Sequence, residues 1–375
     1  MSKLLQRVVP GVALVAAGSA GGVYFERHLK APEEQITTIV DAIGNTPLLE
    51  IKSLSNLTGC RILAKAEFMN PSGSVKDRAA KFLIEDAEAS GQLQPGGIVV
   101  EATGGNTGVG LAIVAAAKGY RTIFTMPDKT SAEKIDLMKV LGAEVHVQPG
   151  VGMADPQHFY NLAKRIVASD PLCFGPDQFE NIANSRAHYV GTGPEIWRQT
   201  AGHVTGFVVA SGTGGTIGGV SKFLKEKNSA IQVWHIDPIE GGASSDYVNT
   251  KQSQVGPDGF EYIPKRDGST VAEGIGLARV TPNFKTGLID RGIFGTNAEI
   301  IQMVYYLLRH EGLFVGPSAA LNVVGAVKMA PPLGPGHTIV TVLCDGGDRY
   351  RSKLFNAKWL EDEKLTQYVD APLKL

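Results

Sequence analysis

The sequence predicts an α/β protein with parallel β-sheets that carry helices on both faces. Two observations support this prediction: short apolar runs alternate with longer helical segments from about residue 40, and glycine-rich loops join them. The length of 375 residues fits one large or two closely joined domains. Ligands of such folds lie beyond the carboxyl ends of the strands, so the loops at these ends are the first candidates for function.

The expected strands and helices follow in order along the chain. Apolar runs predict strands at 61–68, 97–102, 122–126, 143–147, 206–210, 231–236 and 338–343. Helical segments, several of them ending at a glycine, are expected at 77–90, 109–119, 131–141 and 217–224. The stretch 241–270 is polar and rich in glycine and serine, which is typical of an extended surface loop.

The composition argues against several classes of function. Apolar residues make up 43% of the chain and charged residues 19%, and the formal net charge is −1, so nothing indicates nucleic-acid binding. The three cysteines (Cys60, Cys173 and Cys344) include no Cys-x-x-Cys pair, so a zinc or dithiol site lacks support and we expect no metal. Such sparse cysteines fit a reducing compartment.

The N-terminal segment is a candidate membrane anchor. The stretch from Val8 to Phe25 carries no charge and has basic residues on both sides, and a helix of this length spans about 27 Å. A secretory signal cleaved near 17–20 and an apolar helix docked on its own domain are the alternatives. We expect residues 1–30 to be a single-span anchor in the mitochondrial outer membrane, with the catalytic domain facing the cytosol.

The first motif that can carry chemistry is Asn70-Pro-Ser-Gly-Ser-Val-Lys76-Asp-Arg78, which follows a strand and opens a helix. Ser72 or Ser74 can cap this helix, which places Lys76 at or near its first turn. The helix dipole disfavours an ammonium there and lowers the pKa of the amine, as a Schiff-base nucleophile requires. A solvated surface lysine explains the motif equally well when the motif is taken alone.

Two glycine-rich loops each lie between a strand and a helix. The loop Thr103-Gly-Gly-Asn-Thr-Gly108 offers backbone donors for an anion and the amide of Asn106, although a packing turn explains it equally well. The loop 212–216 can direct several N–H groups and two hydroxyls at one point. It lacks the lysine of a P-loop and the spacing of a dinucleotide loop, so a single small phosphate fits it best.

Taken together in chain order, these motifs resemble the cysteine synthase (O-acetylserine sulfhydrylase) and cystathionine β-synthase family of fold-type II pyridoxal-phosphate (PLP) enzymes. Further matching motifs lie at 43–48, 178–181, 192–197, 311–313 and 316–319, so the resemblance covers about residues 40–350. It implies a tryptophan synthase β-like fold of two parallel-sheet α/β domains with the cofactor between them. The implied boundaries are 31–80 with 195–355 for the larger, PLP-binding domain, 81–194 for the smaller domain and 356–375 for a tail.

The resemblance also implies roles for individual positions. Lys76 would bind PLP as a Schiff base and act as the catalytic base, Asn106 would bond the ring hydroxyl, and Ser318 would face the pyridine nitrogen. The phosphate would be held by Gly212, Thr213, Gly214, Gly215 and Thr216. The carboxylate of the substrate would be surrounded by Thr103, Gly105, Thr107 and Gln178. The segment 273–276 resembles the flexible glycine segment of the family, which faces the cofactor.

The implied reaction is β-replacement of O-acetyl-L-serine with sulfide, which gives L-cysteine and acetate, in an enzyme that is commonly a homodimer. A neutral Ser318 at the ring nitrogen favours elimination over reactions that need a long-lived carbanion. A cysteine desulfhydrase or lyase would use the same residues and is the alternative. A catalytically idle membrane-anchored scaffold is the alternative from another class. Thr107 disfavours a serine/threonine dehydratase, and the absent regulatory region disfavours cystathionine β-synthase.

Gly104, Glu273, Arg279 and the closing motif 344–350 depart from the family pattern. Gly104 stands where the family usually has serine, which removes a hydroxyl near the substrate carboxylate. Arg279 can reach a substrate anion, and a solvated surface arginine is the alternative. The closing motif 344–350 is a variant to which the sequence assigns no role.

Overall fold

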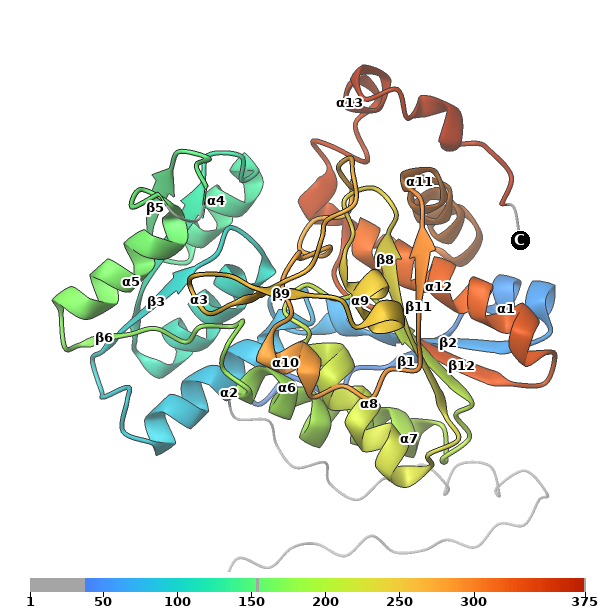
Figure 1. The fold of residues 1–375 in the computed structure, drawn as a ribbon, viewed down its shortest axis with the longest axis horizontal. Helices are drawn as coiled ribbons and strands as arrows, with labels where there is room; N and C mark the ends of the chain where they lie inside the picture. Colours follow the sequence, from blue (N-terminus) through green and yellow to red (C-terminus); the bar gives the residue numbers. More distant parts are fainter. Residues whose placement is uncertain (1–37, 153–154, 374–375) are drawn as a thin grey trace, which may run out of the picture. The chain divides into compact units, whose positions relative to one another are not determined.

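A six-stranded and a four-stranded sheet organise residues 38–152 and 155–373, which are the residues that the computed structural model describes (Figure 1). The larger sheet has the order β1 (Leu48–Glu50), β2 (Arg61–Ala66), β12 (Thr338–Leu343), β7 (Gly206–Val209), β8 (Gln232–Pro238) and β11 (Arg291–Gly295). Its neighbours pair in parallel except β1, which runs antiparallel to β2. The last strand in the chain, β12, therefore lies inside the sheet.

The smaller sheet is fully parallel and has helices on both faces. Its order is β5 (Glu144–Gln148), β4 (Arg121–Pro127), β3 (Ile98–Ala102) and β6 (Cys173–Phe174). Side chains alternate along β3: Val99 packs with α2 (Lys76–Ala89), α3 (Asn106–Lys118) and α4 (Ala132–Val140), whereas Ile98 and Val100 pack with α5 (Phe159–Ser169).

The same alternation divides the core of the larger sheet. Ile62 contributes to the cluster that includes α1 (Lys52–Thr58), α11 (Asn297–Tyr306) and α12 (Pro317–Leu333). Leu63 contributes to the opposite cluster, which includes α7 (Gly193–Gln199) and α8 (Gly215–Lys227). The remaining helices are α6 (Ala183–Ala187), α9 (Ser244–Thr250), α10 (Pro282–Lys285) and α13 (Ala357–Asp362).

The α/β prediction with parallel sheets is confirmed, and each expected strand and helix is present with small shifts at its ends. The expected extended loop at 241–270 is wrong. This stretch contains α9 and a hairpin of β9 (Gln254–Val255) and β10 (Glu261–Tyr262). Its first part turns inward because the carboxylate of Asp237 accepts bonds from the N–H groups of Ala243 and Ser245 at 2.9 and 3.2 Å.

The implied domain boundaries stay a prediction. All strands of the smaller sheet lie between residues 98 and 174, and those of the larger sheet lie at 48–66 and 206–343. Helix α2 continues across the expected boundary at 80/81. The expected tail packs on the body, because Leu360 and Leu365 are buried with Ile301 and Tyr350.

The expected membrane anchor at 1–30 lies outside the described residues. Within residues 38–152 and 155–373, no helix combines the length and the apolar character that crossing a bilayer requires.

Candidate active site

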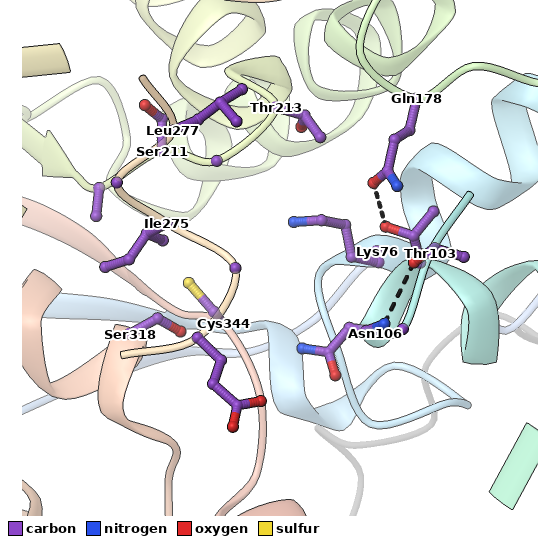
Figure 2. A pocket seen from close by; sticks show the side chains of 18 of the residues that line it. Lys76, Thr103, Asn106, Gln178, Ser211, Thr213, Ile275, Leu277, Ser318 and Cys344 are labelled. Atoms are coloured by element: carbon purple, nitrogen blue, oxygen red, sulfur yellow. Dashed lines mark hydrogen bonds between the residues drawn. The ribbon is translucent and has the colours of Figure 1, made fainter. Parts of the chain in front are cut away.

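A cavity of about 560 Å³ lies where the loops after β3 and β7 meet the start of α2 (Figure 2). This volume suits a small-molecule ligand. The cavity is lined by every candidate residue named from the sequence: Lys76, Thr103, Gly105, Asn106, Thr107, Gln178, Gly212, Thr213, Gly214, Gly215, Thr216 and Ser318. The structure thus brings together residues that are up to 242 positions apart, and the role of each one stays a proposal.

Lys76 is the first residue of α2 and points into the cavity (Figure 2). Its backbone N–H donates to Ser74 Oγ at 3.3 Å, but the N-cap of α2 is Val75 and no side chain among the described residues caps the helix, so the expected serine cap is wrong. Ser72 has a different role, because its own N–H donates to the carboxylate of Asp77 at 2.6 Å. Burial is the largest cause that lowers the pKa of Lys76, against the opposing charges of Cys344 and Asp345. The amine is therefore closer to its neutral, nucleophilic form.

The glycines of the loop 212–216 leave no room for side chains of their own. A Cβ atom at Gly212 would lie 2.0 Å from the carbonyl oxygen of Gly274, and one at Gly215 would lie 2.0 Å from Asn184 Oδ1. Gly214 has a φ of +85°, and α8 begins directly after it. The first N–H groups of this helix have no intrahelical acceptor, so the loop fits the phosphate group of PLP.

Asn106 is oriented by the closing motif to which the sequence assigned no role. Asn106 Nδ2 donates to Asp345 Oδ2 at 2.7 Å, and Asn106 Oδ1 accepts from Arg349. Tyr350 also donates to Asp345 Oδ2, at 2.8 Å, while Asp345 Oδ1 is buried without a hydrogen-bond partner among the described residues. An amide nitrogen has two N–H donors, so Asn106 keeps one for a ligand. An acidic residue two positions after the end of a predicted strand is the signal that could have found Asp345.

The loop 103–108 is tied to Gln178, the last of the predicted substrate residues. Thr107 Oγ1 donates to Gln178 Oε1 at 2.5 Å. The buried carboxylate of Glu101 accepts from the N–H groups of Asp177 and Gln178 at 2.9 and 3.4 Å. Burial and the nearby charge of Asp177 raise the pKa of Glu101 to about 8. The carboxyl group of Glu101, a residue of β3 itself, therefore holds the turn that carries Gln178.

Glu273 and Arg279 flank the glycine segment, and they differ in their surroundings. Glu273 lines the cavity and forms ion pairs with Lys134 of α4 and with Lys353. Arg279 is 7% exposed, pairs with Glu180 at 2.8 Å and stacks on the ring of Phe260. Both interpretations of Arg279 are therefore wrong: it does not line the cavity, and it is not solvated, because Glu180 and Phe260 bury its guanidinium.

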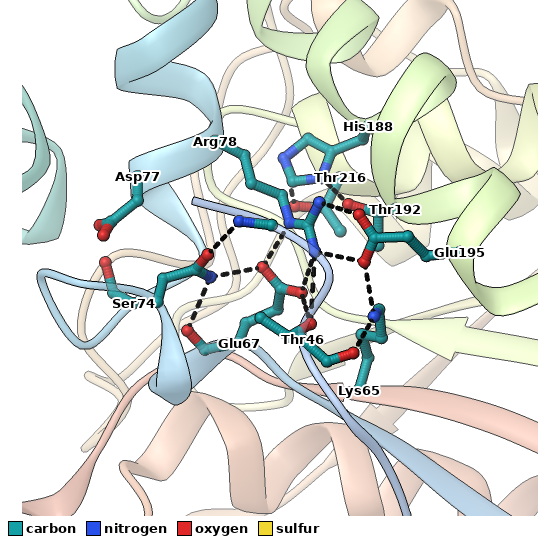
Figure 3. A network of polar contacts seen from close by, with 12 residues as sticks. Thr46, Lys65, Glu67, Ser74, Asp77, Arg78, His188, Thr192, Glu195 and Thr216 are labelled. Atoms are coloured by element: carbon teal, nitrogen blue, oxygen red, sulfur yellow. Dashed lines mark hydrogen bonds and ion pairs between the residues drawn. The ribbon is translucent and has the colours of Figure 1, made fainter. Parts of the chain in front are cut away.

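A buried network of charged side chains surrounds Arg78, which lies in the first turn of α2 (Figure 3). Arg78 bonds both oxygens of Glu195 and both oxygens of Glu67, and Lys65 pairs with Glu195 at 2.6 Å. The neighbouring His188 ring contacts Thr216 Oγ1 at 3.3 Å. Burial and the charge of Arg78 lower the pKa of His188 to about 3, so a neutral ring contacts the loop 212–216.

Known proteins resemble the chain over most of its length. A cysteine synthase of Dictyostelium discoideum is 48% identical over 86% of this chain and 85% of that protein. Cysteine synthase 1 of Emericella nidulans is 41% identical over 99% of this chain and 98% of that protein. A Saccharomyces cerevisiae protein named as a candidate mitochondrial cysteine synthase is 40% identical over 92% of this chain and 88% of that protein.

A solved structure and a family model agree with these relatives. The crystal structure of an O-acetylserine dependent cystathionine beta-synthase from Helicobacter pylori matches with a TM-score of 0.74 and 34% identity, and the match covers 86% of this chain and 99% of that chain. The family model described as pyridoxal-phosphate dependent enzyme matches residues 39–345. The chain therefore belongs to the family of pyridoxal-phosphate dependent enzymes, in the fold-type II arrangement that its motifs led us to expect.

Proposed function

We propose that the protein is a PLP-dependent cysteine synthase, which replaces the acetate group of O-acetyl-L-serine with sulfide and so forms L-cysteine. The observation that carries the proposal is the position of Lys76: its buried amine shares one cavity with a phosphate loop and a carboxylate loop. The names of the relatives from Dictyostelium discoideum and Emericella nidulans favour cysteine as the product, and the Helicobacter pylori enzyme is named as O-acetylserine dependent.

The residues for the cofactor fall into three groups around the cavity. The loop 212–216 would hold the phosphate, Lys76 would bond the aldehyde carbon, and Ser318 and Asn106 would hold the ring nitrogen and ring hydroxyl; all of these residues line the cavity. When bound, PLP supplies an electron sink for the charge that develops at the α-carbon of the substrate. Ser318 offers a neutral hydroxyl at the ring nitrogen, and its helix α12 holds it 6% exposed at the cavity wall.

The loop 103–108 and Gln178 bind the carboxylate of the amino acid. The N-terminus of α3 directs its free N–H groups at this anion, and its dipole favours negative charge there. The amino group of the substrate would take the place of Lys76 on the cofactor and so free the lysine amine. Lys76 then removes the α-proton, because its lowered pKa leaves it able to accept one. The Cβ–O bond breaks and acetate leaves with the electron pair. Sulfide forms the new Cβ–S bond, and the proton on Lys76 returns to the α-carbon.

A substrate panel tests this proposal. Purified protein is supplied with O-acetylserine and sulfide, with O-phosphoserine and sulfide, or with cysteine alone, and the cysteine or sulfide produced is measured. Cysteine from the first mixture supports the synthase, whereas sulfide from cysteine alone would support the desulfhydrase. Lys76→Ala is expected to abolish both turnover and the visible absorption of the bound cofactor. A colourless wild-type protein would support the idle scaffold.

We also propose that the uncharged stretch from Val8 to Phe25 anchors a homodimeric enzyme in the mitochondrial outer membrane. The basic residues on both sides of this stretch support an anchor, and the name of the Saccharomyces cerevisiae relative supports the organelle. Extraction of isolated mitochondria with carbonate tests the anchor, because release of the protein into the soluble fraction would refute it. Light scattering of detergent-purified protein tests the dimer.

A further inference from the structure

Gly104 departs from the serine that is usual in the resembling family, and the structure gives a steric reason. The backbone of Gly104 has no left-handed φ, so any residue could adopt its conformation. A Cβ atom at this position would lie 2.4 Å from Thr130 Oγ1 and 2.9 Å from Thr130 Cγ2. Thr130 therefore fills the space that a side chain at position 104 would need.

Thr130 reaches this space because the loops after β3 and β4 are neighbours. The two strands pair in parallel with Ala102 opposite Thr125, and the N–H of Thr103 continues the pairing by donating to the carbonyl of Thr125 at 2.9 Å. After β4 the chain turns back, and the N–H of Thr130 donates to the carbonyl of Pro127 at 3.1 Å. This turn places Thr130 in the lining of the same cavity as the loop 103–108.

We propose that Thr130 is a substrate-binding residue, whose hydroxyl takes the place of the missing side chain at position 104 and donates to the carboxylate of the amino acid. The inference rests on the proposed function, since it requires an amino-acid ligand at this loop. The adjacent Ser131 supports it independently: Ser131 lines the cavity, and its Oγ is buried without a hydrogen-bond partner among the described residues. A buried hydroxyl without a protein partner is costly unless a ligand supplies one.

Binding of L-alanine and L-alaninamide to the PLP-loaded enzyme tests the proposal. Both ligands lack a β-leaving group, and only the first has a carboxylate, so titration of the visible absorption gives their dissociation constants without turnover. Thr130→Val removes the hydroxyl and keeps the shape. We expect it to weaken L-alanine binding about tenfold or more and to leave L-alaninamide unchanged. Thr130→Ser keeps the hydroxyl and should bind L-alanine as the wild type does.

A second pair of variants tests whether position 104 can supply the hydroxyl in place of Thr130. Gly104→Ser alone should weaken L-alanine binding, because its side chain collides with Thr130. Adding Thr130→Ala should restore binding, since the hydroxyl then comes from position 104. Equal PLP content, measured by absorption, controls for folding of all variants, and Thr250→Val, on an exposed hydroxyl, is the matched control.

Two results would overturn the proposal: Thr130→Val with unchanged discrimination between the two ligands, or a double variant that binds no better than Gly104→Ser. Failure of the proposed function gives a different pattern. In that case the wild type would discriminate normally between L-alanine and L-alaninamide but would form no cysteine from O-acetylserine and sulfide.

Discussion

Replacing Glu195 by glutamine is expected to lower the free energy of unfolding by about 3–5 kcal/mol, which is typical when one partner of a buried ion pair is removed. The Glu195 carboxylate bonds Arg78 at 2.7 and 2.8 Å and Lys65 at 2.6 Å (Figure 3). The three side chains are 7%, 4% and 0% exposed. Glutamine has nearly the same volume as glutamate, so the variant loses little packing. The loss of stability comes from Arg78 and Lys65, which stay buried without the negative charge of Glu195.

The pH dependence of unfolding provides a second measurement on the same variant. Burial alone would raise the pKa of Glu195, but its bonds to Arg78 and Lys65 outweigh burial and lower the pKa to about 2. A carboxylate with a lowered pKa stabilises the fold above its unfolded pKa of about 4.3, and this stability is lost as the pH falls to about 2. The difference between wild type and Glu195→Gln should therefore shrink over this interval.

Urea unfolding, followed by circular dichroism and tryptophan fluorescence, measures the effect. The matched control is Asp86→Asn, because Asp86 pairs with Arg186 at 2.5 Å while their side chains are 40% and 51% exposed. That exposed pair should contribute only about 0–1 kcal/mol. The reasoning fails if Glu195→Gln stays within the change seen for Asp86→Asn, or if its deficit does not depend on pH.

Three further variants address the cavity and its surroundings. Asp345→Asn should lower the affinity for PLP about tenfold, because it removes the charge that orients Asn106. Titration of the apoprotein with PLP, followed by fluorescence, measures this affinity. Unchanged affinity would contradict the orienting role of Asp345. Gly212→Ala should also weaken PLP binding, at a cost of about 1–3 kcal/mol, since its Cβ would meet the carbonyl oxygen of Gly274 at 2.0 Å. Unchanged affinity in the same titration would contradict this steric argument. Arg279→Ala should lower the midpoint of urea unfolding and leave the KM for O-acetylserine unchanged, because its guanidinium pairs with Glu180 outside the cavity lining. A raised KM with normal stability would instead indicate that Arg279 binds a substrate anion.

Local patterns were sufficient for most of the fold. The strand at 338–343 is observed with its predicted ends, because its run of β-branched and apolar residues (Thr-Ile-Val-Thr-Val-Leu) suits a strand covered on both faces. The three-residue strand β1 was missed, since so short a segment shows no periodicity. The stretch 241–270 was misread because its polar residues bond one another and Asp237, and composition alone treats them as solvated.

The residues of the site likewise divide into those that local motifs predicted and those that only tertiary contacts identify. The lysine motif and the glycine loops are local and were found, and the lowered pKa of Lys76 was predicted in direction, with burial as its largest cause. The contact between Asn106 and Asp345 joins positions 239 apart, and that between Gly104 and Thr130 joins neighbouring loops. No periodicity in the sequence reports such tertiary contacts, so these partners needed the structure.

The place of β12 inside the larger sheet has a consequence for biosynthesis. β2 and β7 do not pair with each other; both pair with β12, whose residues leave the ribosome more than a hundred positions after β7. Contacts this distant in sequence form late and slowly. Ser318 and Asp345 flank this strand in the chain, so a nascent chain has Lys76 and the loop 212–216 long before it has a closed cavity. Closure of the cavity therefore requires synthesis to continue through β12.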